Sequence, residues 1–186
     1  MQSFSQPIEV REGTTLVEIC QFRARVWQAT GQVADHAFGK TGWHDPLDAY
    51  SRHWIIRDAG QRLVAAGRLS LHGRLEDVHE AEQYTRWGLP TEGPVAAPDR
   101  VVVCPSAQGF GLARLILDVQ EEAARLSGAR FAVRQASPRM VKLLRQRGWE
   151  ILGPAFEDAR FPQVAFQVAI LRLTQLERDS ELRRAG

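Results

Sequence analysis

A glycine-containing turn just past the middle of the chain carries the residues best suited to bind a ligand. The turn is Gln108-Gly109-Phe110-Gly111-Leu112-Ala113. Before it, Arg100–Val103 is a β-branched run closed by Cys104-Pro105, which predicts a buried strand and its end. After it, apolar residues recur at helical spacing as far as Leu126. A strand, a glycine turn and a helix in this order place free backbone N–H groups at a helix N-terminus, so we expect a phosphate-bearing cofactor there.

Other interpretations of this turn make different demands on the sequence. A Walker-type phosphate loop requires a Gly-Lys-Ser/Thr ending, which is absent. A dinucleotide-binding fingerprint requires three glycines near the start of a larger domain, whereas this turn has two and lies past the middle of the chain. A turn that uses glycine for its geometry alone stays open as a third interpretation.

The pattern Val103-x-Pro105-x-x-Gln108-Gly109-x-Gly111-x-Ala113 resembles the pyrophosphate-binding signature of the GNAT superfamily, the acyl-CoA-dependent N-acyltransferases. In that family the signature lies between the fourth strand and the following helix. The resemblance implies an α/β fold with a mixed, mostly antiparallel sheet that is splayed between its fourth and fifth strands and flanked by helices. Acyl-CoA would lie in the splay. The resemblance is specific over Arg100–Gly148, extends to Leu173 and is weak before Arg52.

The resemblance also implies roles for individual residues. Backbone groups of the fourth strand would bind the pantetheine and polarise the thioester, and the amides of the turn would hold the pyrophosphate. The cofactor-binding residues would then be Val101, Val102, Val103, Gln108, Gly109, Phe110, Gly111, Leu112, Ala113 and Arg114. The family's general acid is a tyrosine four residues before the glycine that ends the next helix, and here that position is Leu144. A thiolate with a pKa of about 8.5 can leave without an enzymic acid.

The N-terminal third resembles the acyl-homoserine-lactone synthases and the long-chain N-acyl amino acid synthases, which share the GNAT core. The matching segments are Arg23-x-Arg25-Val26-Trp27, Trp43-x-Asp45-x-x-Asp48 and Gly67-Arg68-Leu69. A tryptophan replaces the usual phenylalanine of the first segment, and His44 stands where a glutamate is usual. Asp45 and Asp48 would bind a substrate ammonium, or they would cap a short helix in a loop. Arg68 would pair with one of them or lie on the outer face of its strand.

Acyl transfer to an amine also requires removal of a proton from the ammonium nucleophile. The candidate bases are His72, at the end of the second hairpin strand, and Glu76 just after it. A surface or hydrogen-bonded histidine is the competing interpretation of His72. The remaining histidines show no metal-ligand spacing, so no metal is expected.

A mixed set of predicted elements positions these residues. In chain order they are a strand at Pro7–Val10, a helix at Leu16–Trp27, a hairpin of Arg52–Arg57 and Arg62–Leu71, a short polar helix at Glu76–Trp87, an irregular crossing at Gly88–Asp99, the strand, turn and helix described above, a strand at Arg130–Arg134, a helix capped by Ser137 and ended by Gly148, and closing strands at Trp149–Leu152 and Gln163–Leu173. Thr174–Arg184 is a charged tail.

Length and composition exclude several classes of protein. A chain of 186 residues is most simply one domain, here 1–186. A net charge of +2 gives no reason to expect a nucleic acid or a membrane surface as partner. Two cysteines far apart make no disulfide framework. With no signal-peptide pattern and no apolar run of membrane-spanning length, we expect a cytoplasmic location.

Together these patterns predict an N-acetyltransferase that moves an acetyl or other acyl group from acyl-CoA to a primary amine of a small molecule or peptide. A long-chain N-acyl synthase of the acyl-homoserine-lactone type is the alternative within enzymes. A non-catalytic acyl-CoA-binding regulatory protein is the alternative outside them. A homodimer through the last strands stays open.

Overall fold

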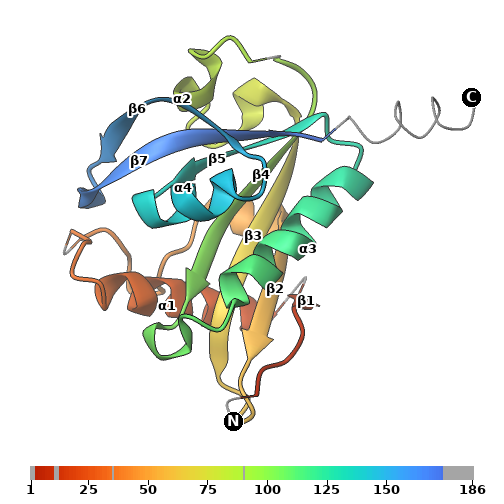
Figure 1. The fold of residues 1–186 in the computed structure, drawn as a ribbon. Helices are drawn as coiled ribbons and strands as arrows, with labels where there is room; N and C mark the ends of the chain where they lie inside the picture. Colours follow the sequence, from red (N-terminus) through yellow and green to blue (C-terminus); the bar gives the residue numbers. More distant parts are fainter. Residues whose placement is uncertain (1–2, 11–12, 35, 90, 174–186) are drawn as a thin grey trace, which may run out of the picture.

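A computed structural model describes residues 3–10, 13–34, 36–89 and 91–173. These residues form one seven-stranded sheet flanked by helices (Figure 1). The strand order is β1-β2-β3-β4-β5-β7-β6, and every neighbouring pair is antiparallel except β4 and β5. The strands are β1 (Ile8–Val10), β2 (Arg52–Arg57), β3 (Leu63–Arg74), β4 (Glu92–Val103), β5 (Phe131–Ala136), β6 (Glu150–Asp158) and β7 (Phe161–Arg172). The helices are α1 (Thr14–Gln28), η1 (Pro46–Tyr50), η2 (Leu75–Asp77), α2 (Glu82–Thr85), η3 (Pro105–Ala107), α3 (Leu112–Leu126) and α4 (Pro138–Arg145).

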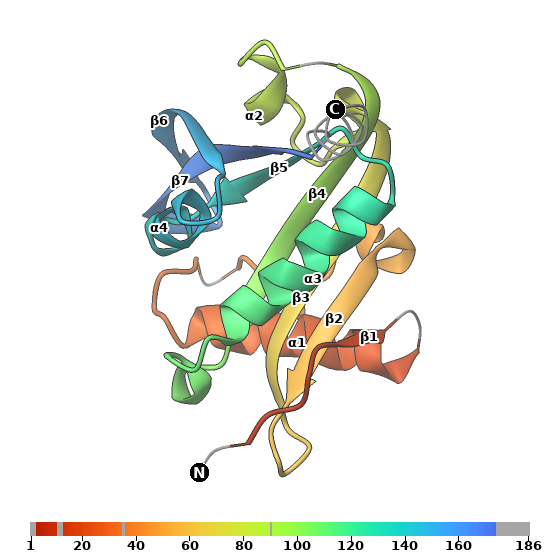
Figure 2. The ribbon, with the colours of Figure 1, turned by 45° about the vertical axis from the view of Figure 1, so that its right-hand side comes forward.

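Alternation along the central strands explains why helices cover both faces of the sheet. On β2, Ile55 packs with Ile19 and Phe22 of α1, whereas its neighbour Ile56 packs with Ile116 of α3. Successive residues of a strand point to opposite faces, so an apolar run such as this one is buried on both sides. Figure 2 shows α1 and α3 on opposite faces of β2, β3 and β4.

The sheet separates between β4 and β5, as the resemblance implies. These two parallel strands pair only through Val95 with Phe131 and Ala96 with Ala132. Beyond Ala96, β4 continues beside β3 as far as Val103, whereas β5 continues beside β7. The edge of β4 that faces β5 therefore carries unpaired backbone groups in the splay. The predicted α/β class, mixed sheet and position of the splay are confirmed.

The prediction of an irregular crossing at Gly88–Asp99 was wrong, because β4 begins at Glu92. Prolines disfavour a strand when each one removes a hydrogen bond from the ladder. Pro98 pairs with Leu69 of β3 and has no β5 residue on its other side. Beside the splay β4 is in effect an edge strand, so it tolerates a residue without an N–H group.

The predicted polar helix at Glu76–Trp87 was also wrong in extent, since the structure has only the short η2 and α2 there. Both closing strands extend further toward the hairpin that joins them than predicted, at β6 and β7. Ser137 does stand at the N-cap of α4, but its side chain makes no capping hydrogen bond. The charged tail lies outside the described residues. None of the helices in the described ranges is long and apolar enough to cross a membrane.

Candidate functional site

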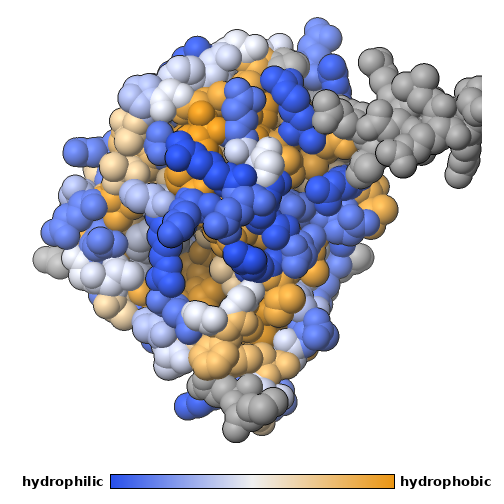
Figure 3. All heavy atoms as spheres, in the orientation of Figure 1, coloured by the Kyte–Doolittle hydropathy of each residue, from blue (hydrophilic) through white to orange (hydrophobic). Residues whose placement is uncertain are grey.

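A groove of about 1000 Å³ runs along the open side of the splay. Its walls include the unpaired edge of β4 at Val101–Val103, the turn Gln108–Arg114, the start of α4 at Ser137–Met140 and the end of α1 at Val26 and Trp27. Figure 3 shows, in the orientation of Figure 1, a hollow with an apolar floor and hydrophilic borders between α4 and the loop before α3. All ten residues predicted to bind the cofactor line this groove.

The turn holds its backbone in a form that favours glycine. Gly109 and Gly111 have φ angles of 86° and 79°, and Gly111 is the N-cap of α3. No atom of the described residues lies within 4 Å of where a Cβ would stand at either glycine. The backbone N–H groups from Gly109 to Ala113 make no hydrogen bond within the described residues, whereas those of Gln108 and Arg114 do. Five free donors at the N-terminus of a long helix fit a pyrophosphate.

Two arginines border this turn, each fixed by a glutamine. The Arg139 guanidinium donates to Gln108 Oε1 at 2.7 Å, and Arg114 donates to Gln146 Oε1 at 3.0 Å. Both arginines line the groove, and neither has a carboxylate partner among the described residues. Their charges therefore stay available to the phosphates of a ligand.

A bulge in β4 determines where its backbone meets the groove. Ala66 of β3 pairs with Val102 and Arg68 pairs with Asp99, so β4 has one residue more than β3 over this stretch. Arg100 lies in this bulge with a φ of 55°, a left-handed conformation that is strained for a residue with a side chain. Its guanidinium donates to Asp45 Oδ2 at 2.6 Å and stacks on the Trp43 ring at 3.9 Å from the centroid.

The three predicted substrate residues meet in one buried ion network. Arg68 Nη1 lies 2.7 Å from Asp45 Oδ1 and 3.1 Å from Asp48 Oδ1. Asp48 also accepts from Arg23 at 2.7 Å. Asp45 and Asp48 form a capping box at the start of η1, which is the alternative that the sequence left open. The side chains of Arg68 and Asp48 are 0% and 1% exposed, and neither residue lines the groove. Their contact with a substrate stays a prediction.

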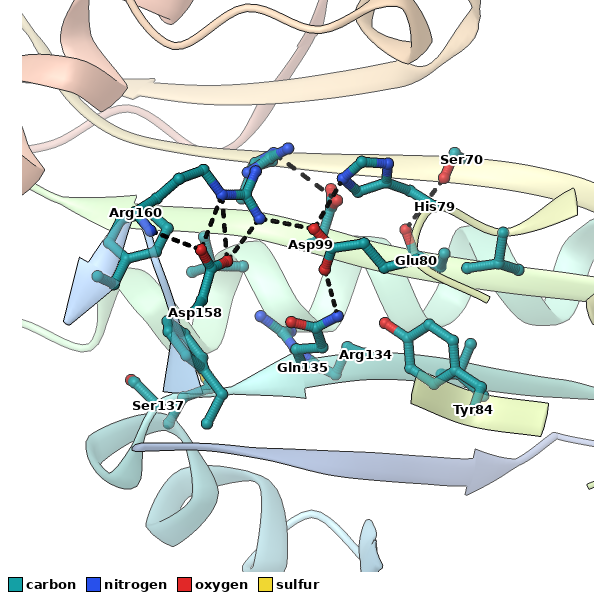
Figure 4. Close-up of a pocket in the computed structure, with 18 of the residues that line it drawn as sticks. Ser70, His79, Glu80, Tyr84, Asp99, Arg134, Gln135, Ser137, Asp158 and Arg160 are labelled. Carbon is teal, nitrogen blue, oxygen red and sulfur yellow. Dashed lines mark hydrogen bonds and ion pairs between the residues drawn. The ribbon is translucent and has the colours of Figure 1, made fainter. Parts of the chain in front are cut away.

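A smaller chamber of about 120 Å³ opens beside the groove, within the splay (Figure 4). The chamber and the groove share Trp27, Val101, Ser137 and Met140 as lining residues. At Val101 a ligand in the groove and a second molecule in the chamber would therefore meet. The chamber's polar lining includes Ser70, His79, Glu80, Asp99, Arg134, Gln135, Asp158 and Arg160.

Arginines compensate the acids of this chamber. Glu80 accepts from Arg160 at 2.7 Å and from Gln135 at 2.6 Å, and Arg160 also donates to Asp158. The His79 imidazole, 3.3 Å from Glu80, together with these two donors, lowers the pKa of Glu80 to about 2. Glu80 is therefore ionised at neutral pH, and its role there is that of an anion rather than a proton acceptor.

The structure does not bring the two predicted bases to the chamber wall. His72 lies two residues beyond Ser70 on β3, and its Nε2 is 2.9 Å from Ser70 Oγ. Ser70 lines the chamber, so His72 reaches it through that hydroxyl. Burial lowers the pKa of His72. Glu76 is exposed on η2 and lines neither cavity. The roles of both residues stay predictions.

Sequence reasoning missed most of the chamber. His79 and Glu80 follow η2 in a segment that was predicted to be helical, and Asp158 and Arg160 lie in the hairpin between β6 and β7. One signal was available. Arg134 interrupts the strand Phe131–Ala136, which is otherwise buried at four of its other five positions. A charge within a buried strand is uncommon unless it is paired or functional.

Within the described ranges, no group of three or more His, Cys, Asp and Glu side chains is arranged to hold a metal ion.

No protein-family model matches this sequence, and no curated protein matches it. Solved structures do match. FeeM, an N-acyl amino acid synthase from uncultured soil microbes, has a TM-score of 0.68 and 13% identity, with 100% of this chain and 99% of that chain covered. The AHL synthase LasI has a TM-score of 0.67 and 14% identity, with 94% and 91% covered. A putative N-acetyltransferase from Lactobacillus plantarum has a TM-score of 0.64 and 14% identity, with 92% and 99% covered. With its splayed sheet and glycine turn, the chain therefore has the GNAT fold of these N-acyltransferases and synthases.

Proposed function

We propose that this protein is an N-acyltransferase that moves an acyl group from acyl-CoA to a primary amine. One observation carries the proposal. Five free backbone N–H groups from Gly109 to Ala113 and the unpaired edge of β4 face the same groove of about 1000 Å³. The pyrophosphate binds at the turn, and the pantetheine extends along Val101–Val103 toward the chamber. Acyl-CoA supplies the activated thioester.

The acceptor amine occupies the chamber and attacks the thioester carbon beside Val101. A C–N bond forms, the C–S bond breaks, and CoA leaves as the thiolate. Backbone N–H groups on the free edge of β4 stabilise the oxyanion. Oxygen atoms of the Glu80, Asp99 and Asp158 carboxylates line the chamber and can accept hydrogen bonds from the amine of the acceptor.

The proton of the ammonium needs an acceptor at the chamber. We propose His79 for this role, because its imidazole lines the chamber beside Glu80. Replacing His79 with Gln should remove the acidic limb of the pH profile of kcat/KM. The same change at His72, which reaches the chamber only through Ser70, is the matched comparison. Loss of the limb in His72→Gln alone would assign the base to His72, as the sequence predicts.

The size of the chamber favours a short acyl group. A volume of about 120 Å³ holds roughly eight to twelve water-sized groups. That room suits an acceptor together with an acetyl or similar group, and not an acceptor together with a long chain. A long-chain synthase is the second candidate, since the network of Arg23, Asp45, Asp48 and Arg68 joins the very residues on which that resemblance rests.

Calorimetric titration with acetyl-CoA, octanoyl-CoA and free CoA tests the proposal, combined with detection of the thiol released in the presence of amines. We expect micromolar binding of acetyl-CoA and amine-dependent thiol release. Preference for octanoyl-CoA would favour the long-chain synthase. Binding with no release for any amine would favour a regulatory protein. Absence of binding for all three ligands would overturn the acyl-CoA proposal.

A further inference from the structure

Among the described residues, Arg134 is a buried cation without a hydrogen-bond partner. It lies in the middle of β5 and is 4% exposed. Its Nε and Nη1 atoms are buried and have no partner within the described residues. Three N–H groups are thus removed from water without compensation, which is costly for a neutral donor and more so for a charged one. Burial lowers the pKa of Arg134 to about 10, so it still carries its charge at neutral pH.

The other charges near Arg134 already have partners. Asp99 is held by two hydrogen bonds from Arg68. Glu121, on the α3 side, accepts from Arg147 and from the Trp149 indole. The other two arginines of the chamber are paired as well, Arg100 with Asp45 and Arg160 with Asp158. Among the described residues that line the chamber, Arg134 is the one arginine without a salt bridge.

The unpaired Arg134 belongs to the lining of the chamber. Figure 4 shows Arg134 next to Gln135 on β5, and Gln135 in turn is hydrogen-bonded to Glu80. The chamber continues from there to Val101 and Ser137, where it meets the groove. A molecule in the chamber would thus contact a cation at one part and the thioester-binding edge of β4 at another.

We propose that Arg134 binds the carboxylate of the acceptor, and that the acceptor is an amino acid or another small molecule with both an amine and a carboxylate. This inference rests on the proposed function and names its substrate class. The bound carboxylate accepts from the Arg134 guanidinium, which has no acceptor among the described residues, while carboxylate oxygens of Glu80 and Asp158 in the chamber accept from the amine. Arg134 is thereby a specificity-determining residue that touches the substrate away from the reacting atoms.

Acceptors that differ only in the carboxyl group show how much the carboxylate contributes to activity, apart from the amine. Thiol release is measured with alanine, leucine, phenylalanine and glutamate, each beside its α-amide and the amine lacking the carboxyl group. We expect kcat/KM to be about 10- to 100-fold higher for the carboxylate form, as for one charge-assisted hydrogen bond. Arg134→Met should remove this preference, so that the carboxylate and amide forms react with equal kcat/KM, and Arg134→Lys should retain part of it. Arg172→Met removes an exposed arginine of β7 and is the control.

A second measurement does not depend on turnover. In protein labelled with ¹⁵N-arginine, the Nε–H resonance of Arg134 is identified by its loss in Arg134→Met. It is followed while the same amino acids and amides are added, with and without CoA. We expect the resonance to move with the carboxylates and not with the amides. Equal movement with both, or with neither, overturns the inference. Absence of CoA binding in calorimetry would overturn the proposed function separately, and the resonance would still decide whether Arg134 binds carboxylates.

Discussion

The guanidinium of Arg68 on β3 holds the carboxylate of Asp99 on β4, with Nε 2.8 Å from Oδ1 and Nη2 2.5 Å from Oδ2. Its third nitrogen, Nη1, reaches Asp45 and Asp48 in the segment before β2. One buried side chain thus joins β3, β4 and the segment between α1 and β2. It does so immediately beside the β4 bulge that precedes the groove.

Arg68→Met should lower the free energy of unfolding by about 3–5 kcal/mol, because it leaves carboxylates in a buried network without their counter-charge. Urea unfolding followed by circular dichroism measures the change. Arg52→Met is the control, since Arg52 forms its ion pair with Glu9 near the surface, with its side chain 34% exposed. That variant should lose at most about 1 kcal/mol. Similar losses in the two variants would contradict a special role for the buried network.

Replacing Arg100 with alanine should destabilise the protein more than replacing it with glycine. Both variants lose the contacts with Asp45 and Trp43, but alanine retains a left-handed backbone that glycine adopts without strain. We expect Arg100→Gly to be more stable than Arg100→Ala by about 1 kcal/mol in urea unfolding. The same pair at Lys142, exposed within α4, should show the opposite order by about 1 kcal/mol. If the glycine and alanine variants ranked in the same order of stability at Arg100 and at Lys142, backbone strain in the bulge would be excluded.

The glycine turn was predictable because its signals are local. The apolar residues before Pro105 follow the pattern of a strand, and those after Gly111 follow the pattern of a helix. Both patterns lie within one short segment, and each arises because the element buries its apolar residues. The GNAT architecture followed from that segment. The start of β4 did not, because whether Pro98 disrupts a strand depends on the absence of β5 beside it. That absence is a property of the assembled sheet.

The chamber was hidden for a similar reason. Arg134 and Glu80 lie far apart in sequence and line the same chamber only because β5 leaves β4 after Ala132. No spacing in the sequence encodes that separation. The ion network was partly visible, since Asp45, Asp48 and Arg68 were singled out together. Its partner Asp99 was missed, because its segment was assigned to an irregular crossing.

Gly111→Asp should abolish acetyl-CoA binding in calorimetry. An aspartate at the N-cap of α3 adds a negative charge at the proposed pyrophosphate position and strains a backbone with a φ of 79°. Gly128→Asp is the matched control, because Gly128 has a φ of 75° and equally open space, at the other end of α3. Both variants should lose about 1 kcal/mol of stability, and only Gly111→Asp should lose the ligand. Retained binding in Gly111→Asp would place the phosphates elsewhere.

Stability should fall in mild acid because His53 is buried in its neutral form. Its Nδ1 lies 3.1 Å from Arg23 Nη2, which can only donate, so the ring proton is on Nε2, 2.8 Å from the Asp48 carbonyl oxygen. Burial, with the Arg23 charge adding to it, lowers the pKa of His53. Below a pH of about 6.5 the unfolded chain therefore binds a proton that the folded chain does not.

The free energy of unfolding should then decrease as the pH falls from about 6.5 toward the lowered pKa, by up to about 1.4 kcal/mol per pH unit for this group. His72, whose pKa burial also lowers, adds to the slope in the same direction. Urea unfolding at several pH values measures it. His53→Gln should flatten the slope, and His36→Gln, at an exposed position, is the control. An unchanged slope in His53→Gln would show that other groups cause the acid sensitivity.

Arg134→Met should make the protein more stable while it removes the preference for carboxylate acceptors. The methionine fills a similar volume, and it removes a buried charge whose Nε and Nη1 have no partner in the part of the chain that the structure describes. We expect the free energy of unfolding without ligand to rise by about 1–3 kcal/mol. Arg23→Met is the matched comparison, since Arg23 is equally buried but bonded to Asp48 and His53, and this variant should lose about 3–5 kcal/mol. If the free energy of unfolding rises in Arg134→Met and falls in Arg23→Met, Arg134 is retained for its ligand at a cost in stability. A lower free energy of unfolding in both variants would instead show that Arg134 stabilises the structure around the splay.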